Sequence, residues 1–304
     1  MTPLPKIGVI GVGAMGLGVV ESLRRHEYPV AVRDIRAEAE SAATRLGATA
    51  HPTPAALGAL GAQCAIVILL VVDAPQIDSV LFGERGAATA LRLGSIVIVS
   101  STVAPAYVAA LGMRLQSMGI RLVDAPVSGG PQRAAAGTMT IMVSGDAATV
   151  GECSALFKAI AGNVFAVGSA PGAAATFKVL NNQLAAVNLA AGAEAMAMAM
   201  RAGVDPHKFM EVVNASSGAS WIFTERMTRA LAGDRTQRAA VTLLHKDVGI
   251  AVDTAQAMGF DAPLARAARA AFVAAVAAGY GAEDDAAMVE YYQASASKPA
   301  SQCR

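Results

Sequence analysis

The sequence predicts an α/β fold: a doubly wound sheet with helices on both faces, followed by an all-helical region that begins with a long helix. Two observations carry this prediction. Up to about Gly168, short β-rich runs alternate with helical stretches, the order expected of a sheet covered on both sides. From Gly172 onward, the β-rich runs end and the segments have helical patterns. A chain of 304 residues is long enough for two domains.

The predicted strands share an apolar, β-rich character and short length. They are Ile7–Ile10, Val30–Arg33, Ala65–Val71, Ser95–Val99, Arg121–Val123, Thr140–Ser144 and Asn163–Val167. The long helix is expected over Ala173–Ala202, about 45 Å at 1.5 Å per residue. We therefore predict a sheet domain over residues 1–168, a helical domain over 169–294 and a flexible tail over 295–304.

Composition argues against several classes of protein. Hydrophobic residues make up 54% of the chain, but many are alanine, and no run reaches the length of about eighteen apolar residues that a membrane span needs. The N-terminus has no signal-peptide hydrophobic region. A net charge of +1 is low for a nucleic-acid-binding protein, which would normally carry a basic face. We expect a cytoplasmic protein with neither a membrane nor a nucleic acid as partner.

Cysteine and histidine usage predicts no metal site. The three cysteines, Cys64, Cys153 and Cys303, are widely spaced and form no CxxC motif, which fits a reducing compartment and no disulfide framework. The four histidines show no metal-ligand spacing, and they are better explained as surface or structural residues.

A glycine-rich turn follows the first predicted strand. The turn reads Gly11-Val12-Gly13-Ala14-Met15-Gly16 and opens a helical pattern. Gly11 allows the tight turn, Gly13 lets the backbone approach a pyrophosphate, and Gly16 allows close packing of helix on strand. The helix N-terminus favours the negative charge of the phosphates. A bare G-x-G-x-x-G can be a structural turn, but strand, motif and helix in this order predict a Rossmann dinucleotide site.

The second predicted strand leads to an acidic residue. Asp34 lies eighteen residues after Gly16, where a carboxylate can accept hydrogen bonds from the adenosine ribose hydroxyls and repel a 2′-phosphate. This predicts NAD as the cofactor. Arg33 and Arg36 flank the carboxylate and could tolerate a phosphate, so NADP stays open.

A second glycine-rich loop predicts an anion site. The segment Asp124-Ala125-Pro126-Val127-Ser128-Gly129-Gly130 follows a predicted strand, and its adjacent backbone N–H groups can converge on an anion. Ser128, Gly129 and Gly130 would hold the carboxylate of a substrate through hydroxyl and N–H groups. The alternative is an ordinary turn, which the Gly-Gly-Pro sequence alone does not exclude.

The long helix supplies candidate catalytic side chains. At 100° per residue, Lys178, Asn181 and Asn182 share one face, within a sector of about 100°. Oxidation of an alcohol needs a group that takes the hydroxyl proton, and Lys178 is the candidate. Asn182 would orient the reacting oxygen, and Asn181 would do the same or contribute to helix packing. An isolated lysine is usually a surface residue, but the two amides one turn away favour a catalytic role.

These motifs resemble those of the β-hydroxyacid dehydrogenase family, which includes 3-hydroxyisobutyrate dehydrogenases, tartronate semialdehyde reductases and threonate dehydrogenases. The resemblance runs in order from Lys6 to about Tyr292. Ser100-Ser101-Thr102-Val103 resembles the cofactor-contacting segment of the family, and Lys246-Asp247 resembles its late lysine motif. The substrate loop departs from the commonest family pattern at Pro131-Gln132-Arg133, which leaves the substrate open.

Two further segments are most similar to threonate dehydrogenases, which act on four-carbon sugar acids. They are Asn214-Ala215-Ser216-Ser217-Gly218-Ala219-Ser220-Trp221 and Gly279-Tyr280-Gly281-Ala282-Glu283-Asp284-Asp285. Trp221 is a candidate wall of the substrate pocket, although a single tryptophan is more often core or interface.

Four more residues are assigned to the cofactor. Val71 ends the third predicted strand, Val72 follows it, and Thr102 comes after the fourth, where a doubly wound sheet exposes its ligands. The resemblance implies that Lys246 reaches the nicotinamide end of the cofactor. Without the resemblance, Thr102 would be a helix cap and Lys246 an exposed lysine paired with Asp247.

The sequence thus predicts NAD-dependent oxidation of a small three- or four-carbon hydroxy acid, such as threonate or a 3-hydroxy acid. One alternative is an NADPH-dependent reductase of a semialdehyde or keto acid, of the tartronate or succinic semialdehyde type. Another is a non-catalytic cofactor-binding scaffold, which Lys178 and both asparagines argue against. The long helix is apolar around most of its circumference, so we expect a homodimer or homotetramer that uses the helical domain.

Overall fold

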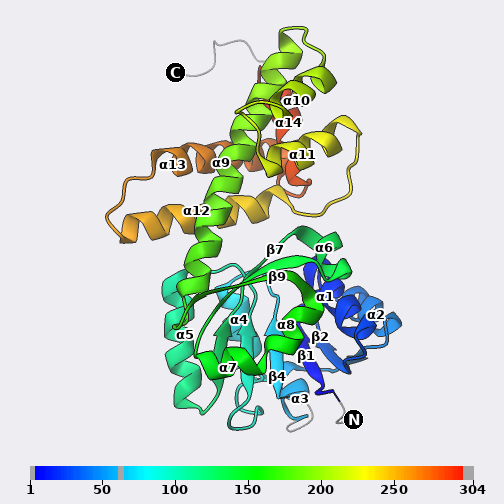
Figure 1. Cartoon of the computed structure of the whole chain (residues 1–304), viewed down its shortest axis with the longest axis vertical. Coiled ribbons are helices and arrows are strands. Elements are labelled where there is room, and N and C mark those ends of the chain that lie inside the picture. Colours follow the sequence, from blue (N-terminus) through cyan, green and yellow to red (C-terminus); the bar gives the residue numbers. More distant parts are fainter. Residues whose placement is uncertain (1–3, 61–64, 297–304) are drawn as a thin grey trace. The chain divides into compact units, whose positions relative to one another are not determined.

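The computed structural model describes residues 4–60 and 65–296 (Figure 1). The chain divides into two compact units, residues 1–178 and 179–304. Cys64, Cys303 and most of the tail predicted over 295–304 lie outside the described residues.

The first unit contains one mixed sheet. Its strands are β1 (Ile7–Ile10), β2 (Val30–Arg33), β3 (Thr49–Ala50), β4 (Ile66–Leu69), β5 (Ile96–Val99), β6 (Arg121–Asp124), β7 (Val127–Ser128), β8 (Met139–Ser144) and β9 (Ala161–Gly168). Their order is β3-β2-β1-β4-β5-β6-β8-β7, and β9 pairs with β8. The strands from β3 to β6 are parallel, whereas β8 runs antiparallel to both β6 and β7.

Helices cover both faces of this sheet. They are α1 (Ala14–Arg25), α2 (Ala37–Arg45), α3 (Pro54–Gly58), α4 (Ala74–Phe82), α5 (Pro105–Ser117), α6 (Gly130–Ala136), α7 (Ala147–Glu152) and α8 (Ser154–Ile160). Alternate residues of β4 enter two different cores: Ile66 and Ile68 belong to the core that contains α1 and α8, and Val67 and Leu69 to the one that contains α4 and α5. Successive side chains of a strand point to opposite faces, so both faces are buried. The predicted doubly wound fold is confirmed.

The structure corrects several predicted boundaries. Strand β4 ends at Leu69, so Val71 lies in the turn that leads to α4 instead of at the end of a strand. The strands β3 and β7 were not predicted because two residues are too few to show an alternating pattern. The short helix α6 begins at Gly130, inside the loop predicted to hold an anion.

The second unit is helical apart from an isolated bridge between Ala240 and Asp284, among the residues described. Its elements are α10 (Pro206–Asn214), α11 (Trp221–Leu231), α12 (Val241–Ala257), α13 (Pro263–Ala275), the π-helix η2 (Val276–Tyr280), the 3₁₀-helix η3 (Asp285–Ala287) and α14 (Met288–Ala296). The helix α9 (Ala173–Arg201) belongs to the first unit through Lys178 and to the second from Val179. No helix in the described ranges is long and apolar enough to cross a membrane.

The helical unit packs around α9. Leu189 and Met196 of α9 are fully buried and share a core with side chains of α11, α12 and α13. A Cβ at Gly192 would lie 2.6 Å from the ring of Phe223, so the missing side chain is what lets the two helices approach this closely. Two ion pairs, Arg226 with Asp285 and Arg229 with Asp284, join α11 to η3.

Candidate active site

The glycine turn after β1 has the shape that a dinucleotide-binding loop needs. Gly11 has φ +91°, and a Cβ there would lie 2.7 Å from the carbonyl of Leu70. A Cβ at Gly16 would lie 2.0 Å from the carbonyl oxygen of Gly11. Gly13 caps α1 without a side chain, and the first turn of α1 carries no acidic residue. The turn therefore leads into a helix N-terminus whose first turn has no carboxylate to compete with a pyrophosphate.

The Asp34 carboxylate lies beside this turn. Its side chain is buried, Oδ2 accepts a hydrogen bond from the N–H of Val12 at 2.8 Å, and Oδ1 accepts one from the N–H of Arg36 at 3.0 Å. Burial opposes ionisation, but the hydrogen bonds from Arg36 and Val12 outweigh it, and the pKa of Asp34 falls below its ordinary value. Arg33 pairs instead with Glu40, at 2.8 Å.

The other proposed cofactor residues follow neighbouring parallel strands. Val71 and Val72 come after β4, and Thr102 comes after β5. Val72 is half exposed, and its N–H donates to Oε1 of Gln76 at 3.0 Å. Because β1, β4 and β5 are parallel and adjacent, these residues lie at the same edge of the sheet as the glycine turn.

The loop that was predicted to bind an anion turns through two glycines and is held against α1. Gly129 and Gly130 have φ of +132° and +78°, which only glycine adopts readily. The helix α6, which starts at Gly130, packs closely on α1: a Cβ at Gly18 would lie 2.7 Å from the Cβ of Ala134. The loop containing Ser128 is thereby fixed to the helix that begins at the glycine turn.

The candidate catalytic residues of α9 differ in exposure. Lys178 and Asn182 are buried, with 7% and 8% of their surface exposed, whereas Asn181 is exposed. Asn181 Nδ2 donates to Oδ1 of Asn182 at 3.1 Å, and Asn182 Nδ2 donates to Oδ2 of Asp247 at 2.7 Å. The helix face predicted from periodicity therefore contains a buried amide, Asn182, and an exposed amide, Asn181, that donates a hydrogen bond to it.

Asp247 of α12 connects two predicted site residues. Its Oδ2 holds Asn182, and its Oδ1 lies 3.0 Å from Nζ of Lys246, in an ion pair too poorly aligned for a hydrogen bond. From the sequence, Asp247 is expected only as the partner of Lys246. Its link to Asn182 was missed because the two residues are 65 positions apart. Trp221, the first residue of α11, is 58% exposed.

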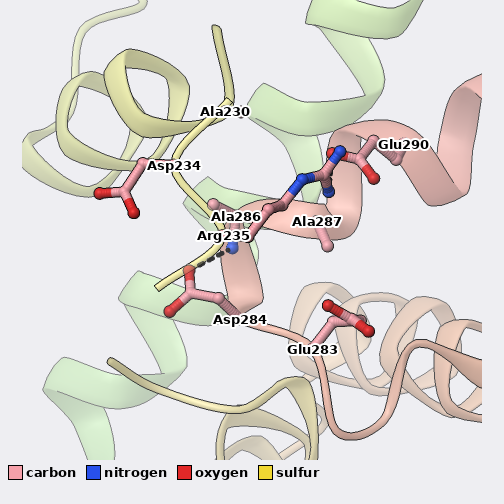
Figure 2. Close-up of a pocket in the computed structure, with 8 residues that line it drawn as sticks. All are labelled: Ala230, Asp234, Arg235, Glu283, Asp284, Ala286, Ala287 and Glu290. Carbon is pink, nitrogen blue, oxygen red and sulfur yellow. Dashed lines mark hydrogen bonds and ion pairs between the residues drawn. The ribbon is translucent and has the colours of Figure 1, made fainter. Parts of the chain in front are cut away.

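The helical unit contains a small pocket (Figure 2). It is lined by Ala230, Asp234, Arg235, Glu283, Asp284, Ala286, Ala287 and Glu290. Arg235 pairs with Glu290, Arg229 with Asp284 and Arg238 with Asp234, so three of the four carboxylates of the lining have an arginine partner. None of the predicted site residues contributes to the lining. Within the described ranges, no group of His, Cys, Asp and Glu side chains is arranged to hold a metal ion.

Comparison with known proteins identifies the class of protein. Residues 6–168 match the family model described as the NAD binding domain of 6-phosphogluconate dehydrogenase. Residues 172–292 match the one described as NAD-binding of NADP-dependent 3-hydroxyisobutyrate dehydrogenase. The chain is thus a nicotinamide-dinucleotide-dependent oxidoreductase. NAD is supported by both matches, and the second also admits NADP.

Individual relatives are similar over almost their whole length. The chain is 44% identical to an L-threonate dehydrogenase of Cupriavidus necator, covering 94% of this chain and 95% of that protein. It is 39% identical to an L-threonate dehydrogenase of Escherichia coli strain K12, with 94% of each covered. A crystal structure of 3-hydroxyisobutyrate dehydrogenase from Salmonella typhimurium superposes with a TM-score of 0.87 at 37% identity, covering 94% and 99%.

The chain belongs to the β-hydroxyacid dehydrogenase family, of the 3-hydroxyisobutyrate dehydrogenase type. It is an NAD(P)-dependent enzyme that acts on the CH–OH group of a small hydroxy acid.

Proposed function

We propose that this enzyme oxidises a three- or four-carbon hydroxy acid of the threonate class with NAD, and that Lys178 is its general acid and base. The burial of Lys178 on α9, one turn from the buried amide of Asn182, is the observation that carries this proposal. The similarity to L-threonate dehydrogenases over 94% of the chain supports the substrate class.

The candidate site residues of α9 have separate proposed roles. The hydroxyl proton of the substrate passes to Nζ of Lys178. A nicotinamide held by the proposed cofactor residues would supply the acceptor for the hydride that the carbon loses. Asn182 already donates one N–H to Asp247 and accepts a hydrogen bond from Asn181. Its second N–H is the one we assign to the reacting oxygen of the substrate. The fixed amide orients the oxygen without further loss of rotamer freedom.

Ser128, Gly129 and Gly130 are the proposed carboxylate site, because two successive glycines at positive φ form a turn whose N–H groups can converge on an anion beside the Ser128 hydroxyl. Trp221, with its half-exposed ring, is the proposed wall of the substrate pocket.

The cofactor residues are proposed in two groups. The first, at the turn after β1 and the end of β2, comprises Gly11, Val12, Gly13, Ala14, Met15, Gly16 and Asp34. The second comprises Val71, Val72, Thr102 and Lys246. We propose residues 1–168 as the dinucleotide-binding domain and 169–294 as the domain for substrate binding and oligomerisation.

We also propose a homo-oligomer, at least a dimer, assembled through the helical domain. Leu184 and Met198 of α9 are 63% and 65% exposed in the single chain. A second subunit would cover such apolar side chains, and two-fold pairing is the commonest arrangement.

The test of the catalytic proposal is Lys178→Ala, with Lys158→Ala as the matched control because Lys158 is an exposed lysine on α8 of the same unit. We expect kcat to fall by about 10² to 10⁴, the usual contribution of general acid–base catalysis, while the Kd for NAD changes little. The control should keep wild-type kcat. A Lys178→Ala variant with more than half of the wild-type turnover would exclude Lys178 from the mechanism.

The substrate class is tested with a panel of three- and four-carbon hydroxy acids, using absorbance of the reduced cofactor as the readout. Within this panel, threonate and the hydroxy acids most similar to it in structure should give the highest kcat/KM with NAD. Faster reduction of tartronate or succinic semialdehyde with NADPH would favour the reductase alternative instead.

A further inference from the structure

The helix α9 begins without a capping side chain of its own. It is preceded by Gly172, and its first turn consists of alanines. Side chains from the sheet take the place of a local cap. The N–H groups of Gly172 and Ala175 both donate to Oδ2 of Asp124, at 2.9 Å each. The N–H of Ala174 donates to Oγ of Ser144 at 3.0 Å. The start of the helix is therefore fixed by two residues distant in sequence.

Asp124 and Ser144 are themselves tightly held. They are 1% and 0% exposed, and they face each other in the register pair that joins β6 to β8. The hydroxyl of Ser144 donates to Oδ2 of Asp124 at 3.2 Å. Burial raises the pKa of Asp124, and the hydrogen bonds from Ala175, Gly172 and Ser144 counteract it. A buried carboxylate at a helix N-terminus is favoured by the helix dipole and by charge-assisted hydrogen bonds.

Asp124 joins two parts of the proposed active site. It is the last residue of β6, and the chain continues from it directly into the loop with Ser128. Through Ala175 it also holds the turn of α9 that immediately precedes Lys178. The Asp124 carboxylate thus connects the start of the loop proposed to bind the substrate carboxylate to the first turn of α9, which carries Lys178.

We propose that Asp124 is a positioning residue for the oxidation. By accepting hydrogen bonds from the N–H groups of Gly172 and Ala175, it fixes how the start of α9 is rotated about the helix axis and how far it lies along that axis. It thereby fixes the position of Lys178 Nζ relative to the loop of Ser128. Ser144 supports Asp124 and holds the third N–H group. A displacement of about 1 Å at a catalytic group can lower the rate about 10²-fold, so the hydrogen bonds from α9 to Asp124 can affect catalysis even through a small movement. The inference rests on the proposed role of Lys178.

The test compares three variants of the full-length enzyme. Asp124→Asn keeps the shape of the side chain but removes its charge. Ser144→Ala removes the supporting hydroxyl and provides a second measurement if Asp124→Asn folds poorly. Asp146→Ala is the matched control, because Asp146 caps α7, which carries no proposed site residue, through the N–H of Thr149 at 2.9 Å.

For folded protein, we expect Asp124→Asn to lower kcat at least about tenfold with the Kd for NAD within about twofold of wild type, and Ser144→Ala to cause a smaller loss of the same kind. Asp146→Ala should lower the Tm and leave kcat unchanged. A purely stabilising role predicts the same behaviour for Asp124→Asn as for the control, and that result would overturn the proposal.

A double-mutant cycle with Lys178→Ala separates this inference from the proposed function. If Asp124 acts through Lys178, adding Asp124→Asn to Lys178→Ala should cause no further fall in kcat. If the double variant instead loses kcat by the product of the two single-variant losses, Asp124 does not act through Lys178, and the positioning role is overturned while Lys178 stays catalytic. A fully active Lys178→Ala enzyme would instead refute the proposed function from which the inference starts.

Discussion

Replacing Asp34 by serine should change the cofactor preference of the enzyme. In the structure, the Asp34 carboxylate accepts hydrogen bonds from Val12 and Arg36, which lower its pKa. With NAD bound, it is the proposed acceptor for the adenosine ribose hydroxyls, and it would repel a 2′-phosphate. Serine removes the charge and leaves a weaker acceptor.

The size of the effect follows from two contributions. A hydrogen bond to a charged group contributes about 1.5–3 kcal/mol, so losing one to the ribose should lower kcat/KM with NAD at least about tenfold. The Nε and Nη2 atoms of Arg36 lie 3.2 and 3.4 Å from the Asp34 carboxylate oxygens, and the substitution releases this guanidinium to meet a phosphate. A comparable gain with NADP would change the NAD-to-NADP preference about 10²-fold in all.

The assay is kcat/KM with each cofactor at saturating hydroxy acid. The substitution also removes the partner of the Val12 N–H and should destabilise the fold by about 1–3 kcal/mol, but the ratio between cofactors cancels any loss of folded enzyme. The double variant Asp34→Ser with Arg36→Ala is the control, and it should lose the gain with NADP. A wild-type enzyme that already prefers NADP would refute the assignment of Asp34.

Two further predictions concern stability and assembly. Burial raises the pKa of Asp285 to about 6, although the positive charge of Arg226 lowers it. Because the folded pKa is above the unfolded pKa of 3.8, the protonated Asp285 stabilises the fold fully below pH 3.8, and this stabilisation is lost as the pH rises through about 6. The stability of wild type relative to Asp285→Asn, from denaturant unfolding, should therefore fall by about 3 kcal/mol from pH 3.5 to pH 7, and a pH-independent difference would contradict this. Light scattering at micromolar concentration should give at least twice the monomer mass of 30.7 kDa, and the monomer mass itself would rule out the oligomer.

The sequence by itself determined the features that depend on neighbours along the chain. Burial of strands such as β1 and β4 on both faces produces apolar runs, and the turn after Ile10 needs glycine for local steric reasons. The doubly wound sheet and the helical second region could therefore be predicted. Asp34 was predicted at the end of β2 because a strand followed by an acid is also a local pattern.

Tertiary structure alone decided how the polar groups are paired. The capping of α9 by Asp124 joins residues 48 and 51 positions apart, and the hydrogen bond from Asn182 to Asp247 spans 65. Helical periodicity placed Asn181 and Asn182 on one face, but only the packed structure distinguished the exposed amide from the buried one. A carboxylate can accept hydrogen bonds from any nearby donor, and which donors are near is fixed by strand order and helix packing, neither of which leaves a pattern in adjacent residues.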